Sequence, residues 1–598
     1  MEKWFMYAKK ADFAEWAKEL GIEPVVARIL RNRDLLSVEE ARRFLYGTVS
    51  DCHAPMLLRD VRQATQHLFY AIRAGKKIRV IGDYDVDGIC SSYLLSTGLS
   101  LLGADVEVAI PHRIHDGYGL NDNLIQEAAQ DGVKLILTCD NGIAAAEQIL
   151  LAKELGVDVI VTDHHEVPYA MEDGKRREIL PAALAVVDPK REEDTYPFPG
   201  ICGCAVAYKL LLAMKDELDQ GNAVWPKGSD AQGFHDKLDD LLEVVAFATV
   251  CDVMELKDEN RIFVREGLKR LHHTKNLGLR ALMEVNGLDP TALTAYHLGF
   301  VLGPCLNATG RLDTARRALE LLQSKDMVVA TGYARDLKEL NDSRKNMTQE
   351  GIDLAMELIQ KNHMEKDKVL VVYLPEVHES LAGIIAGRIR ENIGRPAFLL
   401  TKGEDGVKGS GRSVEGYHMY DALTKVSHLL SKFGGHAMAA GLSLPEGNVN
   451  ALRQELNANC AMTEEDFIPV VHVDAEMPMG YASMELARQL EILEPFGVGN
   501  PKPMFAQRNL TFLAGARMGR DGKYGRFTVQ TPDGRRVQLV FFGNMDAFGV
   551  YLDETFGAGS FEELLSQRGH FSLTVLYQLG INSYHGKEEL QFLMKSYK

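Results

Sequence analysis

Several features are scarce in this sequence of 598 residues, and each scarcity argues against a class of protein. No window contains eighteen uninterrupted apolar residues, so we expect no transmembrane helix. The first twenty residues lack the apolar core of a signal peptide. Eight cysteines without a regular spacing argue against a disulfide framework and for a reducing compartment. We therefore expect a cytoplasmic protein with no membrane partner.

Positively charged residues are also fewer than negatively charged ones. The net charge of −17 argues against a protein that coats nucleic acid indiscriminately. It does not exclude a nucleic-acid enzyme, because carboxylates at a metal site and an acidic surface can coexist with one basic groove. The only close cysteine pair, Cys202 and Cys204, is a weak zinc signal because no second pair accompanies it.

Three aspartates alternate in Asp83-Tyr84-Asp85-Val86-Asp87, directly after the apolar run 78–81, which predicts a short buried strand. On an extended segment this alternation would send the three side chains to one side. Like charges at that spacing repel each other, and a cation that neutralises them makes them tolerable in a partly buried place. The alternative is an acidic turn that caps the following helix, which we expect over 91–102.

Strands and helices alternate from residue 60 to residue 270, which predicts a mostly parallel, doubly wound α/β sheet. Ligands of such sheets bind beyond the carboxyl ends of the strands, where the acidic clusters of this sequence lie. Oxygen ligands together with an imidazole suit manganese or magnesium better than zinc, and a set of this size suits two ions. Taken singly, Asp140 could belong to a plain turn and His165 could be a core histidine. The candidate ligands are Asp85, Asp87, Asp140, His164 and Asp252.

The pattern of elements divides the chain into five segments. A second α/β unit follows a long helix expected over 334–361, and short alternating runs predict an all-β barrel at the C-terminal end. The predicted segments are an N-terminal helical segment (1–55), the first α/β domain (56–275), a helical region with the long linking helix (276–365), the second α/β domain (366–462) and an OB-fold-like barrel (463–598).

Glycines and basic residues outside the acidic clusters indicate phosphate binding. Arg311 follows Gly310 and can approach a phosphate with both arms of its guanidinium. In the glycine-rich stretches 408–413 and 433–441, backbone N–H groups can come close to an anion, although ordinary tight turns are the alternative. Basic residues also interleave with Tyr524 and Phe527 in the barrel, as single-stranded nucleic acid requires, with a charged hairpin as the alternative. Those basic residues are Arg517, Arg520, Lys523, Arg526, Arg535 and Arg536.

In combination and order, these motifs resemble those of the DHH phosphoesterase superfamily. The stretches 83–88, 140–142 and 163–165, followed by Asp252, look like its successive motifs. The stretches 409–413 and 434–441 look like the DHH-associated domain. The stretch 307–313 and the terminal barrel are similar to those of the RecJ family of single-strand-specific exonucleases.

The resemblance implies a single-stranded-DNA-specific 5′-to-3′ exonuclease that releases 5′-mononucleotides in DNA repair and recombination. Two divalent cations, Mn²⁺ or Mg²⁺, would be bound by Asp83, Asp85, Asp87, Asp140, His164 and Asp252, with Asp140 and Asp252 as bridges and Asp83 acting directly or through water. His165, Asp140 and Arg311 would act in catalysis. The strand would be held by Arg311, Arg412, Ser413, Gly434, Gly435, His436, Arg520, Tyr524 and Arg526.

The resemblance also implies partners, and the sequence departs from the family pattern at two positions. It adds a helicase or a single-strand-binding protein as partner, a monomeric state, and a groove between the two α/β domains too narrow for duplex. Ile81 stands where related phosphoesterases often have His, and Cys305 stands where this family is expected to have Arg, which puts one phosphate contact in doubt. A phosphoesterase for short oligonucleotides or cyclic dinucleotides and a metal-free DNA-binding relative remain as other classes. The length and barrel argue against the first, and the intact Asp and His set against the second.

Overall fold

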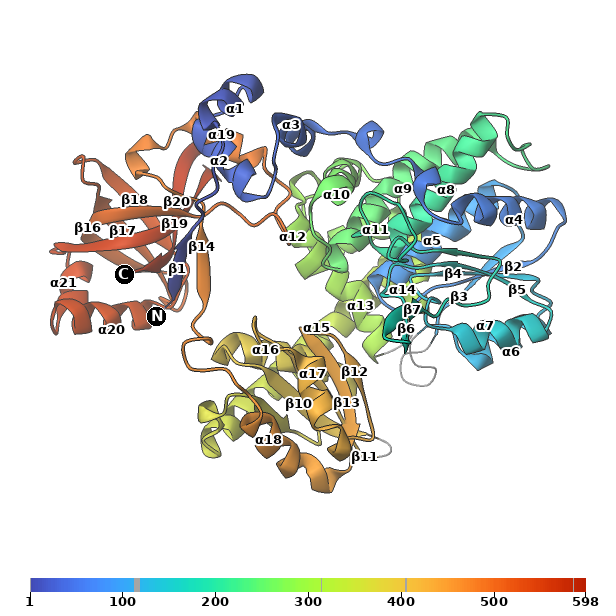
Figure 1. The fold of residues 1–598 in the computed structure, drawn as a ribbon. Helices are drawn as coiled ribbons and strands as arrows, with labels where there is room; N and C mark the ends of the chain where they lie inside the picture. The colour runs from blue at the N-terminus through green and yellow to red at the C-terminus, as the bar shows by residue number, and fades with distance from the viewer. Residues whose placement is uncertain (1, 112–118, 313–314, 404–405, 585) are drawn as a thin grey trace. The chain divides into compact units, whose positions relative to one another are not determined.

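The structure is a computed structural model that describes residues 2–111, 119–312, 315–403, 406–584 and 586–598 (Figure 1). The chain forms two compact units, which are described separately. The larger unit contains Ala54–Asp252 and Gly267–Pro469, and the smaller contains Lys3–His53, Val253–Glu266 and Val470–Lys598. In the described part of the chain, no helix is both long enough and apolar enough to span a membrane.

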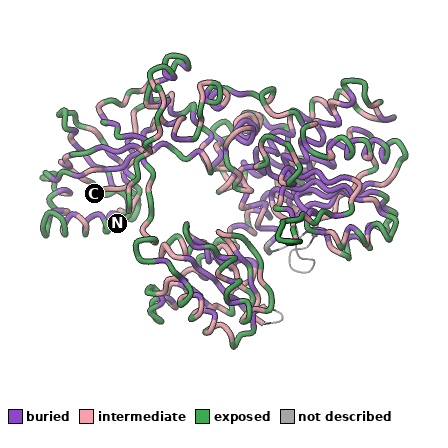
Figure 2. The backbone as a smooth tube through the Cα atoms, in the orientation of Figure 1, coloured by how far each residue is buried: buried purple, intermediate pink, exposed green. Residues whose placement is uncertain are grey.

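A five-stranded sheet with the order β3-β2-β4-β5-β8 begins the larger unit, and all its neighbouring strands are parallel. The predicted doubly wound sheet is thereby confirmed, and all its strands except the edge strand β3 are among the most buried segments of the chain (Figure 2). Helices α6 and α7 cover one face, while α4, α5 and α8 cover the other. The elements are α4 (Val61–Arg73), β2 (Ile78–Ile81), α5 (Val86–Leu101), β3 (Val106–Ala109), α6 (Asp122–Gln130), β4 (Leu135–Cys139), α7 (Ala146–Glu154), β5 (Asp158–Thr162), the small hairpin β6 (Tyr169–Glu172) and β7 (Lys175–Glu178), β8 (Ala185–Val187), α8 (Gly203–Asp219) and α9 (Ala231–Cys251).

Helix α5 begins at Val86, five residues earlier than the sequence predicts. The Asp85 carboxylate caps it, because Oδ1 accepts hydrogen bonds from the backbone N–H groups of Asp87 (2.9 Å) and Gly88 (3.2 Å). Asp87 therefore lies in the first helical turn, and the prediction that all three aspartates alternate along an extended segment is wrong. The acidic turn capping a helix, which was the alternative, is present together with the carboxylate cluster.

A helical region follows in the larger unit and ends in the long helix α15, which begins at Met327 because Asp326 caps it. The helix starts seven residues before the predicted start at Ala334. The elements of this region are α11 (Leu277–Val285), α12 (Ala295–His297), the π-helical turn η4 (Leu298–Leu302), α13 (Gly303–Leu312), α14 (Arg316–Gln323) and α15 (Met327–Lys361).

The second sheet of the larger unit has the order β12-β13-β11-β10-β9, with one parallel pair, β9 and β10. The glycine-rich stretch 408–411 lies inside strand β11 and not in a tight turn. A Cβ on Gly409 would lie 2.3 Å from Leu400 Cδ2, so glycine makes room for the neighbouring strand's leucine. The elements are β9 (Leu370–Tyr373), α16 (Ala382–Ile393), β10 (Ala397–Gly403), β11 (Gly406–Arg412), α17 (Met419–Lys425), β12 (Lys432–Gly435), β13 (Ala439–Leu444) and α18 (Val449–Ala458).

The smaller unit is built on a five-stranded barrel, which β16 and β19 close by pairing with each other. The predicted barrel is confirmed, but the prediction that the segment is all-β is wrong. Asn544 caps helix α20, which packs Phe548 and Leu552 into the barrel core. Their helical spacing was obscured by the short strand-like runs on either side. The elements are α19 (Met484–Glu491), β16 (Phe505–Met518), β17 (Tyr524–Gln530), β18 (Arg536–Phe541), α20 (Met545–Phe556), α21 (Ser560–Leu565), β19 (Phe571–Tyr584) and β20 (Lys587–Tyr597).

The N-terminal helices share a hydrophobic core with this barrel. The first residues are not helical, because β1 (Lys3–Met6) pairs in parallel with β14 (Val470–Val473). Arg33 and Asp474 form a buried ion pair of 3.0 Å beside this ribbon. The three helices are α1 (Phe13–Leu20), α2 (Pro24–Asn32) and α3 (Val38–Tyr46), and α10 (Asp258–Leu271) also contributes to this unit.

Candidate metal centre and adjoining pocket

The turn between β2 and α5 is tight because it contains glycine. A Cβ on Gly88 would lie 2.4 Å from both the backbone nitrogen and the backbone oxygen of Asp83, a separation that no other residue type could tolerate. The turn buries Asp83 and Asp87, each with about 2% of its surface exposed. It thereby places carboxylates at the carboxyl edge of the parallel sheet, where ligands of this fold class bind.

Asp87 is held by the N-terminus of helix α8. Its Oδ2 accepts a hydrogen bond from Gly203 N (2.7 Å), and its Oδ1 accepts one from Cys204 N (2.8 Å). A helix N-terminus favours a negative charge, so these contacts orient the carboxylate at the edge of the sheet. The Cys202-Gly203-Cys204 stretch thus serves the site through backbone N–H groups, and burial raises the pKa of both thiols well above their usual value.

Asp140 and His164, at the ends of β4 and β5, complete the centre together with Asp252, which caps the end of α9. His164 Nε2 lies 3.1 Å from Asp140 Oδ1. The same nitrogen lies 3.6 Å from Asp87 Oδ2 and 3.7 Å from Asp252 Oδ2. Asp140 adopts a left-handed backbone conformation (φ 60°), and a Cβ on Gly203 would come within 2.7 Å of its Cβ. The close approach of the α8 turn therefore depends on Gly203.

The ligand atoms fall into overlapping groups in which every atom lies within 4.8 Å of the others. One group contains Asp83, Asp85 and Asp140, and another contains Asp87, His164 and Asp252. Asp140 also groups with His164 and His165, so it is shared between the two sides of the centre. Carboxylate oxygens and a neutral imidazole at these separations fit two adjacent divalent cations of the Mn²⁺ or Mg²⁺ type.

The electrostatics of the cluster favour a bound cation. Burial, together with the charge of Asp85, raises the pKa of Asp87 to about 7. Burial and the neighbouring aspartates Asp87 and Asp85 raise the pKa of Asp252 to about 8, and the same causes raise that of Asp140 well above its usual value. Each raised pKa records the free-energy cost of ionising a buried carboxyl beside the others. A divalent cation removes that cost, so the residues present fit the metal that the sequence predicts.

The two adjacent histidines have opposite properties. Burial and the charge of His165 lower the pKa of His164 to about 3, which keeps its ring neutral, as a metal ligand must be. Burial also lowers the pKa of His165, but a 2.7 Å hydrogen bond between its Nδ1 and Asp163 Oδ1, together with the negative charges of Asp163 and the other nearby aspartates, outweighs burial and raises the pKa to about 9. His165 is therefore oriented and charged by Asp163, and its half-exposed ring can donate a proton.

Two contributors to the site were not predicted as site residues. Asp163 accepts hydrogen bonds from the backbone N–H groups of His164 (2.7 Å) and Ile143 (2.9 Å), in addition to the bond from His165. Its place between the strand and the His pair was a sequence signal for such a role. Asn307 accepts a hydrogen bond from Val86 N (3.1 Å) across 221 residues of chain, for which no local signal exists.

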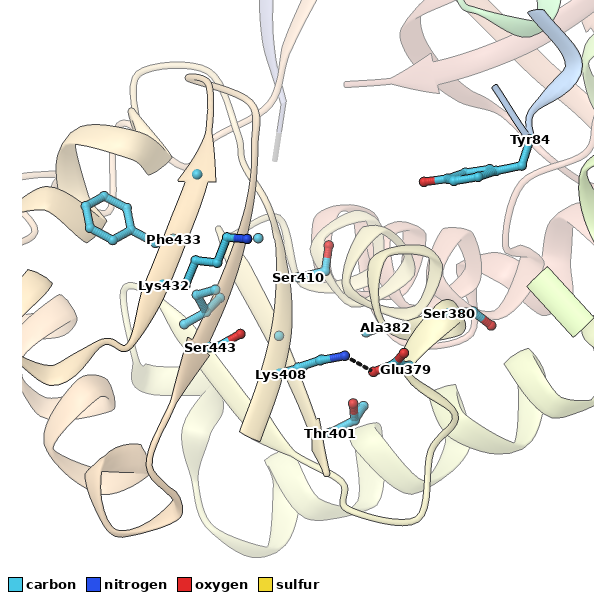
Figure 3. A pocket seen from close by; sticks show the side chains of 14 residues that line it. Tyr84, Glu379, Ser380, Ala382, Thr401, Lys408, Ser410, Lys432, Phe433 and Ser443 are labelled. Carbon is cyan, nitrogen blue, oxygen red and sulfur yellow. Dashed lines mark ion pairs between the residues drawn. The ribbon is translucent and has the colours of Figure 1, made fainter. Parts of the chain in front are cut away.

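A pocket of about 540 Å³ lies between Tyr84 and the second sheet (Figure 3). Ser410 on β11 and Gly434 on β12 line it, and Tyr84 lies on its opposite side. Lys408 and Glu379 form an ion pair of 3.0 Å within it, which Figure 3 marks with a dashed line. The pocket thus connects the loop of the metal centre with the predicted phosphate-binding strands.

The remaining predicted phosphate contacts have different positions. Arg412 donates to Ser410 Oγ (3.0 Å), beside the pocket. Ser413 is buried and donates to the backbone oxygen of Tyr417 (2.6 Å). His436 Nδ1 accepts from Met438 N (3.2 Å), and Gly435 has a positive φ of 140° that its turn requires. The backbone of Arg311 belongs to helix α13, but its side chain lies outside the described residues.

The predicted barrel contacts lie in the smaller unit. Arg520 is exposed in the turn between β16 and β17, and Tyr524 and Arg526 are exposed on β17. The ring of Tyr524 lies edge-on against exposed Phe542, with 5.2 Å between the ring centroids. Phe527, in contrast, is fully buried in the barrel core, so the interpretation that it stacks on nucleobases is wrong. Strand alternation separates these neighbours, since every second residue of β17 points inward.

Three family models match the chain in succession. The N-terminal domain of the DHH family matches residues 77–232, and the DHHA1 domain matches residues 366–462. The RecJ OB domain matches residues 473–596. The metal centre and the sheet that borders the pocket therefore lie in the first two domains.

Relatives of known sequence match nearly the whole chain. The RecJ protein of Bacillus subtilis (strain 168), a single-stranded-DNA-specific exonuclease, is 33% identical over 97% of this chain and 68% of its own length. The protein of the same description from Escherichia coli (strain K12) is 33% identical over 96% of this chain and 95% of its own length.

Solved structures agree with the fold. RecJ from Thermus thermophilus in complex with Mn²⁺ is 27% identical, with a TM-score of 0.79 over all of this chain and 79% of that chain. The Mg²⁺ complex of the same protein gives 25% identity and a TM-score of 0.73, covering 78% of that chain. Both complexes hold an ion of the kind that the carboxylate and imidazole set fits. With its three domains and these near-full-length matches, this chain belongs to the RecJ family.

Proposed function

We propose that this chain is a single-stranded-DNA-specific exonuclease. It hydrolyses phosphodiester bonds with the help of divalent cations, proceeds in the 5′-to-3′ direction, and releases 5′-mononucleotides during DNA repair and recombination. The observation that carries the proposal is the pair of ligand groups that share Asp140 at the carboxyl edge of the parallel sheet. Two cations placed side by side suit in-line displacement at phosphorus.

Each residue of the centre has a role in this reaction. Divalent cations, when bound, lower the pKa of a water molecule and neutralise charge on the phosphoryl oxygens. Asp83, Asp85, Asp87, Asp140, His164 and Asp252 would hold them. His165, oriented by Asp163, donates to a phosphoryl oxygen or carries a proton to the leaving oxygen. Asp87 keeps its orientation through the N-terminus of α8, so the centre is formed before the substrate binds.

The pocket next to the centre supports cleavage at a strand end. Its volume of about 540 Å³ suits a small ligand such as one nucleotide. Arg412, with Arg311 and His436, supplies the positive charge and the donors that a terminal phosphate needs. In this arrangement Gly434 and Gly435 let the backbone approach the phosphate. The buried Ser413 supports the binding site for the DNA end from within the domain. The exposed Arg520, Tyr524 and Arg526 of the barrel bind the strand by phosphate attraction and base stacking.

The proposal includes the molecular context of the enzyme. The chain works as a cytoplasmic monomer, and a helicase or a single-strand-binding protein supplies or presents the unpaired strand. Sedimentation of the purified protein at several concentrations tests the monomer, and a concentration-dependent rise in mass would contradict it.

Hydrolysis of a 5′-labelled single strand of about thirty nucleotides tests the function. Mn²⁺ or Mg²⁺ should allow release of labelled mononucleotide, and a chelator should prevent it. Asp140→Ala should abolish release, since Asp140 belongs to both sides of the centre. Asp158→Asn is the matched control, because this aspartate begins β5 at the opposite edge of the sheet.

Other products would identify other functions. Cleavage restricted to substrates of two to four nucleotides would indicate a short-oligonucleotide phosphoesterase. Binding of the strand without cleavage under any metal condition would indicate a binding protein and would contradict the proposed centre.

A further inference from the structure

The buried face of helix α15 changes character in the middle of the helix. Its buried residues recur at helical spacing, and those near both ends are small or apolar, such as Ala334, Leu337, Ala355 and Ile359. In between, the same face presents Asn341, Arg344 and Thr348. A buried helix face is normally apolar throughout, so three successive polar positions indicate a local requirement.

These three side chains carry buried polar atoms without partners. Among the described residues, no hydrogen bond reaches Asn341 Oδ1, Arg344 Nε or Thr348 Oγ1, although all three atoms are inaccessible to solvent. Asn341 is 1% exposed and Thr348 is 8% exposed. Buried polar atoms are nearly always satisfied by protein, water or a bound ion, so three unsatisfied atoms in one stretch set the middle of α15 apart from the rest of the helix.

The charge of Arg344 makes an anion the fitting ligand. Within the described part of the chain its guanidinium forms no ion pair with a carboxylate, although the protein has a net charge of −17. Burial lowers the pKa of Arg344; the nearby Cys305 partly opposes this effect, and the positive charge of Arg388 adds to it. A partly buried cation beside another cation is costly unless a negative group compensates it. Water could satisfy Asn341 and Thr348, but it could not compensate this charge.

The polar stretch 341–348 of α15 lies between the metal centre and strand β11, which ends at Arg412. On one side, Asn341 Nδ2 donates to Cys305 Sγ (3.4 Å) in helix α13. Asn307 in the same helix accepts from Val86 N (3.1 Å), between the ligands Asp85 and Asp87.

On the other side, α15 packs on helix α16. A Cβ on Gly351 would lie 2.5 Å from Ile385 Cδ1, and a Cβ on Gly383, in the same helix, would lie 2.7 Å from Arg412 Nη2. A strand bound at the centre and at Arg412 would therefore pass along the middle of α15.

We propose that Arg344 binds a phosphodiester of the DNA strand through the outer nitrogens of its guanidinium, since the side chain is only partly buried. The inference rests on the proposed function and adds a substrate contact on the linking helix to those described above.

The salt dependence of binding tests the contact. Affinity for a thirty-nucleotide single strand is measured at several salt concentrations with a chelator present, so that the strand is not cut. For a single strand, each phosphate contact contributes about 0.7 to the slope of log affinity against log salt. Arg344→Gln should reduce the slope by about that amount and weaken binding about tenfold or more. Arg344→Lys should restore the slope. Arg335→Gln, which removes an exposed arginine of the same helix, should leave both quantities unchanged.

Strands that carry one uncharged methylphosphonate linkage locate the contacted phosphate. With the wild-type protein, affinity should fall at the linkage that Arg344 contacts, and Arg344→Gln should lose sensitivity at that linkage alone. A slope that is unchanged in Arg344→Gln, or a variant that keeps the wild-type sensitivity at every linkage, would overturn the inference.

Thermal stability separates a binding residue from a structural one. Removal of an uncompensated charge should leave the melting temperature of the larger unit unchanged or raise it, whereas removal of a structural arginine should lower it. A lower melting temperature in Arg344→Gln would contradict the inference. If the wild-type protein does not cleave single strands at all, the proposed function fails instead, so the two failures are distinguishable.

Discussion

His164 and His165 show how much one hydrogen bond decides at the scale of a residue. The two rings are adjacent, with 4.6 Å between their centroids, yet only the ring of His165 forms a hydrogen bond with the Asp163 carboxylate, through its Nδ1. Asp163 itself is fully buried, which raises its pKa. The hydrogen bond and charge of His165 outweigh this, so the net pKa is lowered. Asp163 is therefore a charged positioning residue, although it is not in the predicted ligand set.

Replacement of Asp163 by Asn tests this positioning role. The change removes the charge that orients and protonates His165 but leaves the ligand set intact, so we expect kcat to fall about 10- to 100-fold with little change in KM. In a double-mutant cycle, His165→Ala should cost much less in the Asp163→Asn background than in the wild type. Additive losses would show that the two residues act independently. Asp158→Asn serves as the control.

The buried Glu243 in helix α9 predicts a pH-dependent stability. Burial raises its pKa to about 7, and hydrogen bonding to Thr274 only partly opposes this effect. The folded state therefore binds a proton more tightly than the unfolded state, and the stability it contributes is present below about pH 4.5 and is lost as pH rises through about 7. Glu243→Gln removes this dependence. From pH 5 to pH 8.5, the free energy of unfolding of the variant should rise by about 2–3 kcal/mol relative to that of the wild type.

Denaturant unfolding of the larger unit at several pH values measures that difference. Glu284→Gln, which changes an exposed glutamate in helix α11, is the matched control and should show no such trend. Parallel pH profiles for wild type and Glu243→Gln would contradict the prediction.

At the scale of elements, local patterns were sufficient for some features and insufficient for others. The apolar runs before Asp83, Asp140 and His164 are local signals, so the sequence predicts the strands and the edge at which the candidate ligands gather. The contacts that orient Asp87 and Val86 come from residues 116 and 221 positions away, and no local pattern contains them. The sequence did not predict that the helix starts at Val86. Aspartates that alternate along a strand and an aspartate that caps a helix give the same short sequence pattern.

Arg261 shows how one side chain joins elements of the smaller unit. Its buried guanidinium in α10 donates to the backbone oxygens of Phe44 (2.7 Å), Leu493 (2.8 Å) and Glu494 (2.8 Å). Its carbon Cζ lies 3.8 Å from the Phe44 ring centroid, so α3, α10 and the segment after α19 meet at one residue. Burial lowers its pKa to about 9, which leaves the side chain charged at neutral pH.

Arg261→Met should therefore destabilise the smaller unit. The substitution leaves several buried carbonyl oxygens without a donor, and we expect a loss of about 3 kcal/mol or more in its free energy of unfolding. Arg488→Met, which breaks an exposed ion pair with Glu588, should cost at most about 1 kcal/mol. Denaturant titrations of both variants compare the two, and equal losses would contradict the special role of Arg261.

At the scale of the whole molecule, the division into two units predicts how metal affects stability. All proposed ligands belong to the larger unit, and the fourteen-residue strands of the barrel belong to the smaller one. A ligand stabilises only the unit that binds it. Calorimetry should therefore resolve two transitions, and Mn²⁺ should raise the temperature of the one that belongs to the larger unit. Asp140→Ala should abolish the shift without changing the other transition.

The size of the Mn²⁺ shift should depend on pH. The raised pKa values of Asp87 (about 7) and Asp252 (about 8) mean that, without metal, these groups contribute stability at low pH that is lost as pH rises through 7 and 8. Bound Mn²⁺ requires both carboxylates ionised, so binding releases protons and tightens as pH rises. The shift should be several degrees larger at pH 8.5 than at pH 6. A shift independent of pH would mean that the cation does not bind at these carboxylates.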